Sequence, residues 1–164
     1  MKRTLVLVRH GRARMDPTDD TAMALTATGR EHFASTVTTL SRLGMRFDAL
    51  FHSPVLCAVQ SAKLLTPLVD GEARRSALLM RPPEADLLDL VTAPQVCMVG
   101  HRPFLAALVA WLTIGRRTHA DAFELDRGGV VVLEGQPEPG RMRVKALWPC
   151  EALRVCGSQE GGRT

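Results

Sequence analysis

Three short apolar runs constrain the fold of this chain more than any other feature. The runs Thr4–Val8, Phe47–His52 and Gln95–Val99 are each only a few residues long, and each gives way abruptly to polar residues. Short runs of this kind are typical of strands that are buried on both faces of a sheet. Segments with helical signals follow each run, and strands that alternate with helices indicate a mainly parallel sheet.

Helix signals fill the gaps between these strands. Thr28 and Glu31 have the spacing of a capping box, and apolar positions at helical spacing follow them as far as Gly44. Ser53-Pro54 is expected to open a second helix, with proline in its first turn, that runs to about Leu68. The remaining predicted elements are a short edge strand over Ser76–Met80, a short helix over Glu84–Leu90, an apolar helix over Phe104–Ile114, and a closing hairpin of Val130–Leu133 and Met142–Trp148. The sum is a three-layer α/β/α sandwich with a mainly parallel sheet and an antiparallel edge.

The length of 164 residues fits a single domain. We expect this domain to span residues 1–156. Residues 157–164 are polar and contain glycine, which predicts a flexible tail.

Charge and composition exclude several classes of partner. The net charge of +4 favours acidic ligands such as phosphorylated substrates. The basic residues are scattered, with only short pairs at Arg74-Arg75 and Arg116-Arg117, and the chain has no tyrosine for base stacking, so we expect no nucleic acid. The first apolar run stops at Arg9, too soon for an export signal, and no run approaches the roughly 20 residues of a membrane span. We therefore expect a cytoplasmic protein that does not bind membranes.

The cysteine spacing gives no sign of a structural metal. The four cysteines form no C-x-x-C pair, and we expect neither a metal nor a cofactor. They are Cys57, Cys97, Cys150 and Cys156.

Chemistry-bearing residues follow all three predicted strands. Because the carboxyl ends of parallel strands meet at one edge of a sheet, these residues should lie together. A neutral imidazole can accept a phosphoryl group, arginine offers a planar fork of donors to phosphate oxygens, and glycine allows close approach of the backbone. A phosphoryl site is therefore predicted at this edge. The three strand ends are Arg9-His10-Gly11, His52-Ser53-Pro54 and Gly100-His101-Arg102-Pro103.

The order and spacing of these blocks resemble the histidine phosphatase superfamily, and in particular its short SixA-type phosphohistidine phosphatase branch. The resemblance implies a phosphoglycerate mutase-like fold in which His10 accepts the phosphoryl group. It further implies that Arg9 binds phosphate and that His101 is the second pocket histidine. We expect Gly11, Ser53 and Arg102 to contribute to phosphate binding. The blocks that carry the resemblance are Arg9-His10-Gly11, Leu25-Thr26 with Gly29, Ser53-Pro54 with Ala58 and Gln60, and Val99-Gly100-His101.

One position departs from the family pattern. Where the family has a second phosphate-binding arginine, this chain has Cys57. Either the site has lost catalytic power, or Arg102, Arg12 or Arg14 compensates. Cys57 does not belong to a tyrosine-phosphatase type of loop, because position 63 is Lys63 rather than arginine. A reactive thiol and an inert replacement remain the alternatives for it.

The sequence offers no clear general acid. Glu84 and Asp86 lie in the region that supplies one in larger members of the superfamily, but neither has a matching motif. An imidazole leaving group needs less help than an alcohol. A phosphohistidine on a protein is therefore the favoured substrate. A phosphatase of a small phosphomonoester and a non-catalytic module that binds phosphorylated partners are the alternatives.

Overall fold

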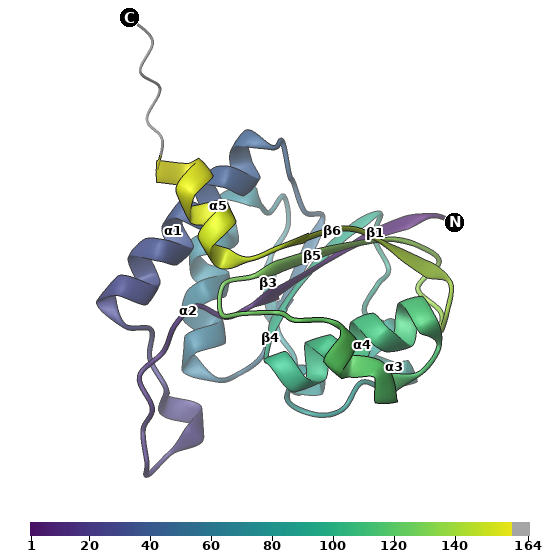
Figure 1. The fold of residues 1–164 in the computed structure, drawn as a ribbon, viewed down its shortest axis with the longest axis horizontal. Helices are drawn as coiled ribbons and strands as arrows, with labels where there is room; N and C mark the ends of the chain where they lie inside the picture. The colour runs from purple at the N-terminus through teal and green to yellow at the C-terminus, as the bar shows by residue number, and fades with distance from the viewer. Residues whose placement is uncertain (159–164) are drawn as a thin grey trace, which may run out of the picture.

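In the computed structural model, which describes residues 1–158, one six-stranded sheet lies between two layers of helices (Figure 1). The order across the sheet is β3-β2-β4-β1-β5-β6. The first four strands are parallel, β5 runs antiparallel to β1, and β6 runs antiparallel to β5. The predicted three-layer sandwich with an antiparallel edge is confirmed. The strands are β1 (Arg3–Arg9), β2 (Ala49–His52), β3 (Ala73–Arg75), β4 (Gln95–Gly100), β5 (Val130–Gly135) and β6 (Met142–Trp148).

The two helical layers differ in make-up (Figure 1). One face of the sheet carries α1 (Ala27–Arg42), α2 (Leu56–Leu65) and α5 (Cys150–Ser158). The other face carries α3 (Ala85–Leu88) and α4 (Arg102–Ile114). No helix in the described part of the chain is both long and apolar enough to cross a membrane. Short 3-10 segments complete the connections: η1 (Asp20–Ala22), η2 (Thr66–Leu68), η3 (Ala77–Met80) and η4 (Arg117–Ala122).

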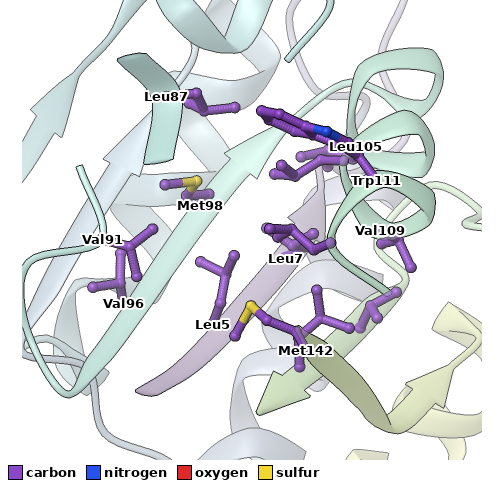
Figure 2. Close-up of a cluster of buried hydrophobic side chains, with 14 of the residues drawn as sticks. Leu5, Leu7, Leu87, Val91, Val96, Met98, Leu105, Val109, Trp111 and Met142 are labelled. Atoms are coloured by element: carbon purple, nitrogen blue, oxygen red, sulfur yellow. The ribbon is translucent and has the colours of Figure 1, made fainter. Parts of the chain in front are cut away.

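Alternate residues of β1 belong to two separate cores. Leu5 and Leu7 pack toward α4, in the cluster that Figure 2 shows, whereas Val6 and Val8 pack toward α1 and α2. All four are buried, which explains why this strand is a continuous apolar run rather than an alternating one. Burying such side chains contributes about 1.5–3 kcal/mol each, so the centre of the sheet is a stable base for its edge.

The predicted edge strand at Ser76–Met80 is wrong. The edge strand is β3, three residues earlier, and Ala77–Met80 forms η3. The Ser76 hydroxyl caps η3 by accepting the Leu78 N–H at 3.3 Å, and Leu79 is buried beneath it. A short apolar run does not by itself distinguish a strand from a helical turn. Here the serine cap decides in favour of the turn.

Two predicted helix starts were also misplaced. The N-cap of α1 is Thr26, whose hydroxyl accepts the Gly29 N–H at 2.9 Å, so Thr28 and Glu31 form no capping box. The helix α2 begins at Leu56, beyond the Ser53-Pro54 pair that was expected to open it.

The helix α5 was not predicted. It runs over Cys150–Ser158 and packs Leu153 into the core beside α1. Its last two residues, Gly157 and Ser158, belong to the segment predicted as a tail, and the rest of that segment lies outside the described residues.

Candidate active site

Three neighbouring strands deliver the candidate residues to one edge of the sheet. The strand β4 lies between β2 and β1, and Arg9 of β1 is in register with Gly100 of β4. His10 and His101 therefore follow adjacent strand ends, and their ring centroids are 5.1 Å apart. The Ser53 hydroxyl, at the end of β2, lies 2.8 Å from Nε2 of His101. The predicted convergence of the three strand ends is confirmed.

His10 is held as a neutral imidazole with one nitrogen free. Its Nδ1 lies 2.7 Å from the carbonyl oxygen of Gly11, which can only accept, so Nδ1 carries the proton and Nε2 keeps its lone pair. Burial, together with the neighbouring His101 and the positive charges of Arg9 and Arg127, lowers the pKa of His10 to about 4. At neutral pH this nitrogen is available for nucleophilic attack.

His101 occupies the N-cap position of α4 and is oriented by Ser53. The Ser53 side chain is fully buried, and its oxygen also accepts the Val55 N–H at 3.2 Å. Burial and the charge of Arg9 lower the pKa of His101, so it too is neutral near pH 7. Ser53 was predicted to bind phosphate, but its hydroxyl is committed to holding His101.

Arg9 reaches this site with part of its donor set unused. One terminal nitrogen donates to the carbonyl oxygen of Leu125 at 3.1 Å. Its Nε–H is buried and has no partner in the described part of the chain. Burial, and then Arg127 and Arg102, lower the pKa of its guanidinium. A buried donor without an acceptor is costly, and an oxyanion in the site would satisfy it.

The site opens into a cavity of about 250 Å³ with a cationic rim. Arg102 and Arg127 line it beside Arg9, both with exposed side chains. Among the described residues, neither Arg12 nor Arg14 lines this cavity. Sequence reasoning missed Arg127, which lies in the loop before β5 and belongs to no motif. The full lining is Arg9, His10, Ala13, Met15, Met23, His101, Arg102, Pro103 and Arg127.

Cys57 lies in the first turn of α2 and is fully buried. Burial raises the pKa of its thiol to about 11, so the side chain is an uncharged thiol at neutral pH and not a reactive thiolate. Its sulfur and one ring nitrogen each of His10 and His101 all lie within 4.8 Å of one another. Cys57 therefore lies directly beside the two histidines.

Comparisons with known proteins give a consistent fold. No protein-family model and no curated protein sequence matches the chain. The histidine phosphatase SixA, solved with tungstate, superposes with a TM-score of 0.77 at 19% identity over 92% of this chain and 99% of that one. A mycobacterial glucosyl-3-phosphoglycerate phosphatase gives 0.69 at 16% identity, covering 90% and 99%. A phosphoserine phosphatase from Entamoeba histolytica gives 0.69 at 15% identity, covering 92% and 99%. The chain has the histidine phosphatase fold.

Several motif residues of this histidine phosphatase fold support the site without lining it. The Gly11 N–H donates to the Ser61 hydroxyl at 3.0 Å, and that hydroxyl donates to the carbonyl oxygen of Cys57 at 2.7 Å. Gly11 was expected to offer its backbone to phosphate, but its N–H is already used. The amide oxygen of Gln60 accepts the Leu25 N–H at 2.8 Å. These bonds tie α2 to the loop that follows His10.

Gly29 allows that loop to approach α1 closely. A Cβ atom at this position would lie 2.2 Å from the carbonyl oxygen of Arg12. Only glycine permits this contact without a backbone shift.

The histidine phosphatase fold here offers no carboxyl group to the cavity, within the residues described. Glu84 and Asp86, the two candidates from the sequence, are exposed and pair with Arg81. The described lining of this cavity therefore combines neutral imidazoles with cationic side chains. The carboxyl group of Asp121 lies in a neighbouring cavity that Arg9 and Arg102 also line.

Proposed function

We propose that this chain is a phosphatase that forms a phosphoryl intermediate on Nε2 of His10. The observation that carries the proposal is the free, unprotonated Nε2 at a cavity bordered by cationic side chains. A phosphorylated substrate would place its phosphorus against this nitrogen. The N–P bond forms as the bond to the leaving group breaks, and water then attacks phospho-His10 to release phosphate.

The surrounding groups have separate roles in this proposal. Arg9, Arg102 and Arg127 bind the phosphoryl oxygens and stabilise the charge that spreads over them in the transition state. If the Ser53 hydroxyl donates to Nε2 of His101, the other ring nitrogen carries a proton that can be donated to a phosphoryl oxygen. Arg127 supplies the phosphate contact that an arginine at the position of Cys57 makes in the resembled family.

A cavity lining that has no carboxyl group, among the described residues, favours phosphohistidine over an alcohol phosphate as substrate. An imidazole leaving group takes up a proton from water near neutral pH, whereas an alkoxide needs a positioned donor. SixA, a protein histidine phosphatase, is among the structures that this chain resembles. Phosphoserine phosphatase is another, so a small phosphomonoester remains the second candidate substrate.

Turnover measured on two substrates tests the proposal. A histidine-phosphorylated phosphotransfer domain should lose its phosphoryl group faster than an aryl phosphate of the same concentration. The reaction should survive EDTA, and His10→Ala should abolish it. Acid-labile radiolabel from the substrate should appear on the parent chain and not on His10→Ala.

Binding separates a phosphatase from a non-catalytic module. Tungstate should bind the parent in calorimetry and bind His10→Ala more weakly. Tight tungstate binding without turnover of either substrate would favour the module, and equal affinity in both proteins would contradict the assigned site.

A further inference from the structure

The replacement of the family arginine by Cys57 creates a set of metal ligands that the sequence spacing did not reveal. A buried thiol and two buried or half-buried imidazoles come from three separate elements, and their ligand atoms lie within 4.8 Å of one another. We propose that His10, Cys57 and His101 bind a thiophilic cation of the zinc type, and that this cation competes with the phosphoryl group. The metal site itself does not depend on the proposed function.

The spacing of the three ligand atoms suits such an ion. With bond lengths of about 2.0–2.1 Å to nitrogen and 2.3 Å to sulfur, the ligands of a tetrahedral zinc lie roughly 3.4–3.6 Å apart. Contracting the cluster to this size takes a shift of about 1 Å in the three side chains. Three protein ligands and one open position are the usual arrangement of an accessible zinc site.

Hydrogen bonds already orient the two imidazoles as metal ligands are normally oriented. Nδ1 of His10 donates to the Gly11 carbonyl oxygen, which directs the Nε2 lone pair away from the backbone. When Nε2 of His101 donates to the Ser53 oxygen, the ring plane is fixed and Nδ1 keeps its lone pair for the ion. Cys57 is held by α2, whose first turn is tied to Gly11 through Ser61.

The arginine side chains decide which cation can enter. Arg9, Arg102 and Arg127 line the same cavity and repel any positive ion. Binding forms a metal–sulfur bond and releases the thiol proton to solvent, and the thiolate then cancels part of the charge of the ion. Hard cations such as Mg²⁺ gain nothing from sulfur or imidazole, so we expect zinc-type ions to bind and magnesium not to bind.

A bound metal ion would inhibit the phosphatase reaction. The same Nε2 lone pair of His10 cannot coordinate zinc and attack phosphorus. This consequence, unlike the metal site, rests on the proposed function.

Cobalt spectroscopy tests the site directly. Titrating the full chain with Co²⁺ should produce the sulfur-to-cobalt charge-transfer band and the visible bands of four-coordinate cobalt, and Zn²⁺ should remove them. Cys57→Ser should lose the charge-transfer band and bind Zn²⁺ at least about tenfold more weakly, since a lost ligand outweighs a lost supporting contact. Cys156→Ser, which changes an exposed cysteine away from the cavity, should behave as the parent does.

Each outcome of this experiment bears on the proposal. Absence of the band in the parent, or its persistence in a Cys57→Ser protein with native circular dichroism, would overturn the metal site. If the parent turns over, Zn²⁺ should inhibit it at concentrations that leave Cys57→Ser active. A parent without turnover that still shows the cobalt spectrum would reject the proposed function and leave the metal site standing.

Discussion

Removing the Arg127 guanidinium tests the phosphate contact that we propose for this side chain. Arg127 lines the cavity with His10, and its charge contributes to lowering the pKa values of both Arg9 and His10, which places it within electrostatic reach of the nucleophile. A charge-assisted hydrogen bond to phosphate contributes about 1.5–3 kcal/mol. If the contact is made mainly in the transition state, Arg127→Ala should lower kcat/KM by about 10- to 150-fold.

The assay compares four proteins on the same histidine-phosphorylated substrate: the parent, Arg127→Ala, Cys57→Arg and the double mutant. Cys57→Arg alone should not raise kcat/KM, because the new guanidinium enters a buried position beside Arg9. In the Arg127→Ala background the same substitution should restore activity, because it supplies the missing donor fork. Arg14→Ala, an exposed arginine outside the cavity, is the matched control and should match the parent.

Two results would refute this account of Arg127. An Arg127→Ala enzyme within twofold of the parent would show that the guanidinium does not contact the transition state. A gain from Cys57→Arg in the parent background would show that position 57 is an uncompensated loss. The double mutant separates these cases, since additive effects would mean that the two positions do not share a phosphate oxygen.

Three further substitutions or conditions probe the same site. Because burial lowers the pKa of His10 from 6.5 to about 4, its contribution to stability is present above pH 6.5 and is lost as the pH falls toward 4. The thermal midpoint of the parent should therefore drop more over that range than that of His10→Ala, and parallel pH profiles would contradict it. Ser53→Ala should lower kcat about tenfold with little change in KM, because it frees the His101 ring; an unchanged ring-proton NMR spectrum for His101 would count against this role. Gly29→Ala should lower the thermal midpoint by roughly 3–10 °C, because its methyl group collides with the Arg12 carbonyl oxygen; an unchanged midpoint would mean the loop yields freely.

Local patterns account for the parts of the fold that could be predicted. The apolar run before Arg9 predicted a central strand, because its short length and its valine and leucine residues are typical of a strand buried on both faces. Topology then brought His10 and His101 together, because the strands that precede them are parallel neighbours.

The remaining features depend on contacts that local patterns do not encode. Arg127 enters the cavity from a loop with no motif, about 117 positions after His10, so only the folded chain places it there. The buried residue of the helix α5 is Leu153, which packs into the core beside α1 from the other end of the chain. The serine cap at Ser76 outweighed the apolar run that followed it. A cluster of His10, Cys57 and His101 is likewise a product of three distant segments.

The central place of β4 has a consequence for how the protein is made. The strand β4 separates β2 from β1, although it follows both along the chain. Before residues 95–100 leave the ribosome, β1 and β2 lack the strand that joins them. Each then has an open, apolar sheet edge. Insertion of β4 gives both strands their common partner and brings the residues after β1 and β4 to one edge of the sheet. Contacts this distant in sequence form slowly, so synthesis of the first half of the chain precedes any phosphate-binding ability, and chaperone protection would matter most before β4 emerges.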